Sequence, residues 1–99
     1  MKVTKQQIDE VIKNKGVLQF SASWCMPCKV LSRTIEDNQD KLQQVQRLYI
    51  DLDANQELAT EYNVRSVPTL ILFENGQETK RTVGSKSIDQ LIEFIGGEQ

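Results

Sequence analysis

The sequence of 99 residues contains no histidine. This excludes Cys–His nucleophilic dyads and histidine metal ligands, and it removes the usual proton carrier near neutral pH. Only two cysteines are present, Cys25 and Cys28. A structural zinc site usually needs four Cys or His ligands, so zinc could bind only if two chains shared the metal. We therefore expect no metal site in the single chain.

Long apolar segments and runs of basic residues are also missing. No stretch approaches the length of a membrane span, and a net charge of −2 without a basic face argues against nucleic-acid binding. The first seven residues carry lysines but no apolar core behind them, unlike a signal peptide. We expect one domain over residues 1–99, located in a reducing cytoplasm, with neither a membrane nor nucleic acid as partner.

The apolar pattern predicts the element order α-β-α-β-α-β-β-α. Capping boxes mark two helix starts, at Thr4 with Gln7 and at Ser87 with Gln90, and Asn75-Gly76 predicts a hairpin. The predicted elements are a helix from Thr4 to near Gly16, a strand over 17–22, a helix after the cysteines whose apolar face continues to Leu42 and Val45, a strand over 47–53, a helix over 54–62, strands over 69–73 and 77–83, and a helix that Gly96-Gly97 stops. This order predicts an α/β fold: a mixed central sheet of four or five strands flanked by four helices.

The two cysteines fall where the first predicted strand leads into a helix. The unpaired N–H groups and positive dipole end of a helix N-terminus favour a thiolate, the reactive form of cysteine. Dithiol–disulfide exchange is therefore the favoured reading, with Cys25 as the outer, attacking thiol and Cys28 as the resolving thiol. Besides a zinc site shared between two chains, the remaining alternative is a structural disulfide. Such a disulfide would close too short a loop to stabilise the fold much.

Around these cysteines the chain resembles the thioredoxin family, over nearly its whole length. The resemblance rests on Phe20, on the segments 24–29 (WCMPCK) and 48–51, on Val67-Pro68-Thr69, on 73–76 (FENG), and on Val83-Gly84. It implies a thioredoxin fold and an enzyme that reduces protein disulfides through Cys25 and Cys28 without a bound cofactor. It also implies a monomer whose partners are disulfide-containing proteins and thioredoxin reductase, an NADPH-dependent flavoprotein that re-reduces the Cys25–Cys28 disulfide.

The same resemblance implies a substrate-docking surface. Its residues would be Trp24, Met26, Pro27, Val67, Pro68 and Gly84. Pro68 is expected to follow a cis peptide bond and to face the disulfide. Val67 would then offer backbone groups to an extended substrate peptide, as in strand addition.

Gln19 and Met26 depart from the family pattern. Gln19 stands where most thioredoxins carry a buried Asp that accepts the proton of the resolving thiol, and Met26 stands where a Gly is usual. Because an amide does not titrate, deprotonation of Cys28 must use water or the leaving Cys25 thiolate, and resolution should be slower. The Gln19 amide can hold a water or donate a hydrogen bond, and Arg47 is expected to reach solvent, Asp51 or Glu57.

Two other functions fit the same sequence. A glutaredoxin-like protein would use glutathione, although its cysteine motif is typically CPYC. A thioredoxin fold can also serve as a binding subunit of a larger enzyme, without redox turnover, through the same apolar surface.

Overall fold

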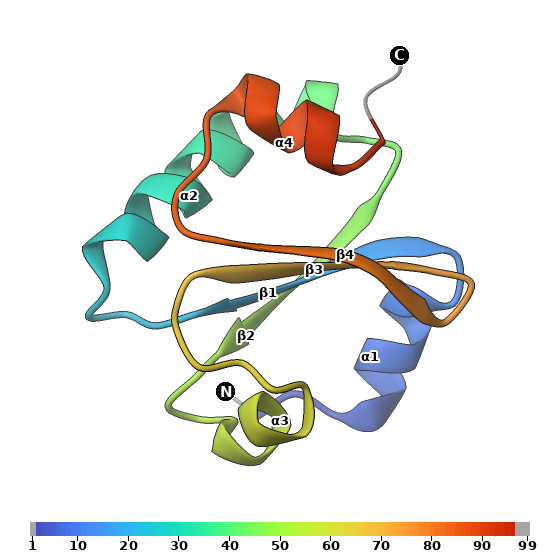
Figure 1. Ribbon diagram of the computed structural model, residues 1–99, viewed down its shortest axis with the longest axis vertical. Helices are drawn as coiled ribbons and strands as arrows, with labels where there is room; N and C mark the ends of the chain where they lie inside the picture. The colour runs from blue at the N-terminus through green and yellow to red at the C-terminus, as the bar shows by residue number, and fades with distance from the viewer. Residues whose placement is uncertain (1, 97–99) are drawn as a thin grey trace.

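The computed structural model describes residues 2–96 and contains a four-stranded mixed sheet with four α-helices (Figure 1). In chain order the elements are α1 (Lys5–Ile12), β1 (Lys15–Ser21), α2 (Met26–Asp37), a 3-10 helix η1 (Gln39–Lys41), β2 (Gln46–Asp51), α3 (Gln56–Glu61), β3 (Thr69–Glu74), β4 (Gln77–Val83) and α4 (Ile88–Phe94). The predicted order and the mixed sheet are confirmed, with four strands. No helix among the described residues is both long and apolar enough to cross a membrane.

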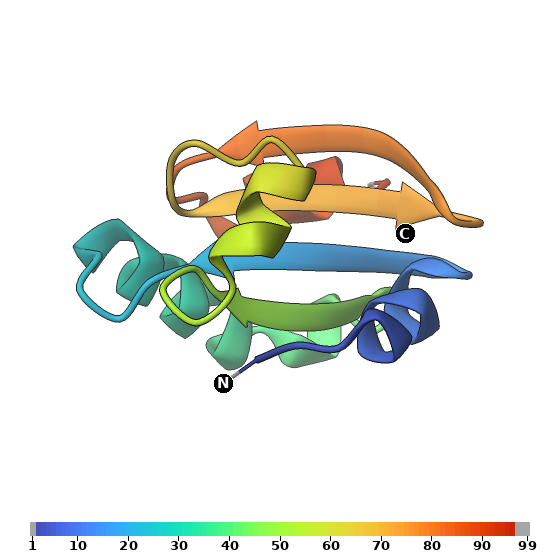
Figure 2. The same cartoon turned by 90° about the horizontal axis from the view of Figure 1, so that it is seen from below.

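The strands lie in the order β2-β1-β3-β4, which can be followed in Figure 2 from green through blue to orange. β1 runs parallel to β2 and antiparallel to β3, and β3 and β4 form the predicted hairpin. At its turn Asn75 and Gly76 both have positive φ, +55° and +84°, as a tight hairpin turn requires. β1 therefore lies inside the sheet, between β2 and β3, which both follow it much later in the sequence.

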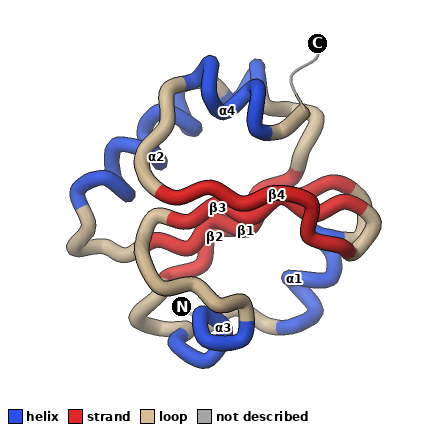
Figure 3. The backbone as a smooth tube through the Cα atoms, viewed as in Figure 1, coloured by secondary structure: helices blue, strands red, loops and turns tan. Residues whose placement is uncertain are grey.

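Two helices cover each face of the sheet, with α1 and α3 on one side and α2 and α4 on the other (Figures 1 and 3). Alternation along β1 divides its side chains between two apolar clusters: Leu18 and Phe20 face α1 and α3, whereas Val17 faces α2 and α4. Gln19 lies on the same face as Val17 and is fully buried. A polar side chain thus lies beneath the helix that carries the cysteines.

Both predicted capping boxes are present. Thr4 Oγ1 accepts a hydrogen bond from the Gln7 N–H at 3.1 Å, and Gln7 Oε1 accepts one from the Thr4 N–H at 2.8 Å. Ser87 and Gln90 make the equivalent pair at the start of α4, at 3.2 and 2.9 Å. These reciprocal bonds satisfy N–H groups that have no partner inside the helix.

The helix after the cysteines is shorter than predicted. It ends at Asp37 because Asn38 leaves the helical region (φ −129°), and its side-chain amide donates to the backbone oxygen of Thr34 at 2.8 Å. Leu42 and Val45 still pack on the apolar cluster, but from the segment between η1 and β2. The spacing of apolar residues thus predicted correctly that Leu42 and Val45 pack on the core, but it predicted too long a helix.

The other helix ends also differ from prediction. α1 ends at Ile12 rather than near Gly16, which instead belongs to β1. A Cβ atom at Gly16 would overlap the backbone oxygen of Val11, so the absence of a side chain lets β1 pass against the end of α1. α4 ends at Phe94, and Gly96 follows with φ +116°, whereas Gly97 lies outside the described residues.

Candidate active site at the start of helix α2

The two cysteines lie at the carboxyl end of β1, where the chain turns into α2. The Cys25 N–H donates to the Ala22 backbone oxygen at 3.2 Å, which closes the turn, and Cys25 is the N-cap residue of α2. Pro27 occupies the first turn, where its missing N–H costs no helical hydrogen bond. The two sulfurs are joined in a disulfide, with the Cα atoms 5.2 Å apart.

The start of α2 places positive electrostatic potential on the sulfur of Cys25. The Cys28 N–H donates to Cys25 Sγ at 3.2 Å, so the sulfur takes the place of the oxygen acceptor of an ordinary N-cap. A hydrogen bond to an ionised acceptor is stronger than one to a neutral acceptor, and the helix dipole acts in the same direction. Once the disulfide is reduced, both effects favour the thiolate of Cys25 over its thiol.

A loop from the other half of the chain lies beside the disulfide. The Val67–Pro68 peptide bond is cis, as predicted, and the backbone oxygen of Val67 is 3.8 Å from Cys25 Sγ. Pro68 is fully buried, and its backbone oxygen accepts a hydrogen bond from the Gly84 N–H at 2.9 Å. Of the predicted docking residues, Val67 and Gly84 are thus half-buried around a buried Pro68.

The remaining predicted docking residues lie at the surface. Trp24 and Met26 are each 65% exposed, which is high for large apolar side chains, and Pro27 is also exposed. The Trp24 indole N–H donates to the Asp53 carboxylate at 2.9 Å, which fixes the ring beside the cysteines. Asp53 was missed from the sequence because its contact spans 29 residues, although an acidic pair flanking Leu52 after a strand could have suggested it.

Gln19 is held by protein side chains. Its amide nitrogen donates to the hydroxyls of Ser21 and Ser32, both at 3.0 Å. Its oxygen accepts a hydrogen bond from a guanidinium N–H of Arg47. Ser32 was not singled out from the sequence, although it lies one helical turn after Cys28 and so on the same face of α2.

The prediction that Arg47 turns to solvent, to Asp51 or to Glu57 was wrong in its choice of partner. The β1–β2 register places Arg47 opposite Val17 and thus diagonal to Gln19 on the same face of the sheet. Burial lowers the pKa of Arg47, and the carboxylate of Glu36 partly opposes that effect. A half-buried cation is therefore held by a neutral amide rather than by a carboxylate.

A pocket of about 360 Å³, lined mostly by polar side chains, borders Cys28. Ser32, Glu36 and Tyr49 are among the side chains that line it. Burial raises the pKa of the Tyr49 hydroxyl, and the Asp51 carboxylate adds to the shift. The pocket gives solvent a path to the neighbourhood of Cys28, which itself is only 2% exposed.

A disulfide at a helix N-terminus beside a cis-proline loop, on a mixed α/β sheet, defines a thiol–disulfide oxidoreductase. The thioredoxin family model matches residues 1–97. A thioredoxin of Chlamydia trachomatis is 40% identical over 91 residues, which cover 92% of this chain and 89% of that protein. The structure of Fasciola hepatica thioredoxin superposes with a TM-score of 0.82 and 28% identity, covering 96% of this chain and 90% of that one. The chain belongs to the thioredoxin family.

One further relative combines two activities in its name. A bifunctional thioredoxin reductase/thioredoxin of Mycobacterium leprae is 42% identical over 86 residues. The match covers 85% of this chain but only 19% of that protein.

Proposed function

We propose that the protein reduces disulfides of other proteins, with Cys25 as nucleophile and Cys28 as resolving thiol. The Cys25 thiolate attacks one sulfur of a substrate disulfide, forms a mixed disulfide and expels the first substrate thiolate. Cys28 then loses its proton and attacks Cys25 Sγ, which releases the second substrate thiolate and leaves the Cys25–Cys28 disulfide. The observation that carries this assignment is the Cys28 N–H bond to Cys25 Sγ, because it favours the charged form of one cysteine only.

Substrate binding is proposed at the apolar patch formed by Trp24, Met26, Pro27, Val67 and Gly84, with Pro68 beneath it. The exposure of Trp24 and Met26 and the position of Val67 beside Cys25 Sγ support this assignment. An extended peptide laid along Val67 would bring its own cysteine to the disulfide.

The proton of Cys28 is proposed to leave through water in the polar pocket or to the departing Cys25 thiolate. Gln19 is buried close to α2, but its amide does not titrate, and both its polar atoms are already engaged. The step therefore lacks a buried carboxylate acceptor at this position. This supports the expectation of slow resolution.

The oxidised protein is proposed to be re-reduced by an NADPH-dependent flavoprotein of the thioredoxin reductase class. The mycobacterial relative, whose name joins both activities in one chain, supports this partner. A single domain acting as a monomer in the cytoplasm suits the function, because the dithiol must be its resting form.

Trapping of the mixed disulfide tests the roles of the two cysteines. Cys28→Ser should accumulate a covalent complex with a disulfide-bonded protein substrate, whereas the matched variant Cys25→Ser should form none. Accumulation with Cys25→Ser alone would reverse the assignment.

Three further measurements separate the alternative functions. A reduction potential near about −270 mV supports a reductase, whereas a value above about −200 mV indicates a glutaredoxin-like or oxidising role. Turnover with glutathione alone would also favour the glutaredoxin-like reading. A double Cys→Ser variant that keeps full biological activity would favour a binding subunit.

A further inference from the structure

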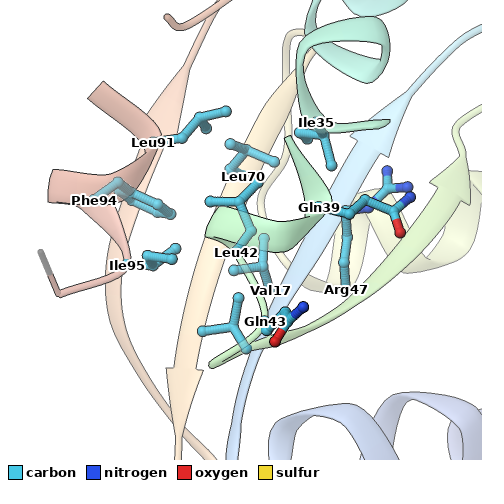
Figure 4. Close-up of a pocket in the computed structure, with 11 residues that line it drawn as sticks. Val17, Ile35, Gln39, Leu42, Gln43, Arg47, Leu70, Leu91, Phe94 and Ile95 are labelled. Atoms are coloured by element: carbon cyan, nitrogen blue, oxygen red, sulfur yellow. The ribbon is translucent and has the colours of Figure 1, made fainter. Parts of the chain in front are cut away.

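A second pocket lies on the α2/α4 face of the sheet, toward the carboxyl end of α2 (Figure 4). Its volume is about 340 Å³, and apolar side chains from the sheet, α2, η1 and α4 form most of its wall. They include Val17, Ile35, Leu42, Leu70, Leu91 and Phe94. Ligand pockets usually hold about 300–1,000 Å³, and an apolar cavity of about 150 Å³ already binds benzene. The space is large enough for a small apolar ligand.

The end of α2 at Asp37 explains why this space is open. A continuous helix through Leu42 and Val45, as the apolar period predicted, would lay its turns across this part of the sheet. Instead the chain passes through η1, and Leu42 and Val45 reach the apolar cluster only from its edge. This pocket shares no lining residue with the polar pocket beside Cys28.

Polar groups gather at one edge of the pocket. Gln39, Gln43 and Arg47 line it, and Figure 4 shows the polar ends of Gln39 and Arg47 at the edge opposite Leu91 and Phe94 of α4. The pocket therefore has an apolar wall on one side and hydrogen-bond donors on the other. This division matches a ligand with an apolar body and a polar head.

Arg47 gives the polar edge its charge. No carboxylate among residues 2–96 forms an ion pair with its guanidinium, which donates one hydrogen bond, to Gln19. A guanidinium has five N–H donors in a planar fork suited to a carboxylate, so most of its donors are left for another acceptor. The Glu36 carboxylate attracts this guanidinium without forming an ion pair with it. A half-buried cation gains more from an anionic partner than an exposed one does, because less water screens the pair.

We propose that this pocket binds a small amphipathic carboxylate of the medium-chain fatty-acid type. The hydrocarbon tail would lie against Leu70, Leu91 and Phe94, and the carboxylate would accept hydrogen bonds from Arg47 and the amide of Gln39. The inference does not depend on the redox chemistry at Cys25 and Cys28. A failure of binding would leave the proposed function intact.

The choice of head group tests the proposal on the unaltered protein. Decanoate, kept below its micelle concentration, should shift the amide NMR signals of Leu42, Leu91 and Ile95, which line the pocket. Decyltrimethylammonium has the same tail and the opposite charge, and it should bind there at least tenfold more weakly. Equal affinities for the two, or shifts confined to the apolar patch beside the disulfide, would overturn the proposal.

Variants of the protein test the two halves of the site separately. Arg47→Gln should weaken decanoate binding about tenfold, which corresponds to about 1.4 kcal/mol. Lys5→Gln removes an exposed charge from α1 on the other face of the sheet and should leave the affinity unchanged. Val45→Phe should fill part of the pocket and also weaken binding about tenfold. An unchanged affinity in a folded Arg47→Gln or Val45→Phe protein would contradict the site, and the head-group comparison stands if neither variant folds.

Discussion

Replacing Gln19 and Arg47 together should cost less stability than the two single replacements added together. Gln19→Leu keeps the size of the buried side chain but removes every hydrogen bond it makes. Arg47→Met removes the guanidinium but keeps an unbranched apolar stem. Each single variant leaves the other partner buried or half-buried without its hydrogen bond, whereas the double variant leaves neither.

The expected energies follow from the contacts. The bond between the Arg47 guanidinium and Gln19 Oε1 involves a charged donor, and such bonds contribute about 1.5–3 kcal/mol. Gln19→Leu also removes the donor from the Ser21 and Ser32 hydroxyls, which can rotate toward other groups, so its total cost should be about 2–4 kcal/mol. Arg47→Met leaves a fully buried amide oxygen unpaired and should cost about 1–3 kcal/mol. The coupling energy of the cycle should be about 1.5–3 kcal/mol.

Urea unfolding of the four oxidised proteins, followed by far-UV circular dichroism, measures the cycle. If all four proteins unfold with the same slope of about 1.5 kcal/mol/M, a coupling of about 2 kcal/mol places the urea midpoint of the double variant about 1.3 M above the value expected from adding the two single shifts. The exposed Arg33–Asp37 pair, 3.6 Å apart on α2, provides a matched control cycle with an expected coupling below about 0.5 kcal/mol. A Gln19–Arg47 coupling no larger than that of the control would refute the reasoning.

Three further outcomes are expected. Gln19→Asp should speed resolution in single-turnover reduction of a protein disulfide by about tenfold or more, because a positioned carboxylate can accept the thiol proton; an unchanged rate and pH profile would contradict this. Gly16→Ala should lower the free energy of unfolding by at least about 2 kcal/mol, measured in urea, because its Cβ would overlap the backbone of Val11. The hydrogen bond from Arg81 lowers the pKa of Glu78 below its ordinary value of 4.5, so this pair stabilises the fold above that pH and loses its effect as the pH falls below it. Glu78→Gln should therefore make the fall in stability between pH 7 and pH 3 smaller, by less than about 1 kcal/mol for so exposed a pair; urea midpoints at both pH values that fall as far as in the unaltered protein would speak against it.

Features that depend on neighbouring residues could be predicted from the sequence. Both capping boxes, the Asn75-Gly76 hairpin and the position of the cysteines at a helix start are set within a few residues. The cis bond before Pro68 was different, because the local sequence alone does not favour it and the family resemblance supplied it.

Features that depend on contacts between remote segments could not be predicted in the same way. The partner of Arg47 is fixed by the register of β1 against β2, and one-dimensional patterns do not reveal which side chains become diagonal neighbours. The end of α2 was missed because Leu42 and Val45 are buried as a helical period requires, although the backbone that carries them is not helical. Burial pattern and backbone conformation agree only while the helix continues.

The central place of β1 also bears on when the chain can fold during its synthesis. β1 leaves the ribosome long before β3, the strand with which it forms its antiparallel pairs. These pairs run from Phe20 with Thr69 to Lys15 with Glu74. At about 5–20 residues per second, the roughly fifty residues between β1 and the end of β3 take about 3–10 s to add. During that interval the apolar strand has no antiparallel partner, and its parallel partner β2 is complete only once Asp51 has been added. The sheet is therefore completed only when most of the domain has been made.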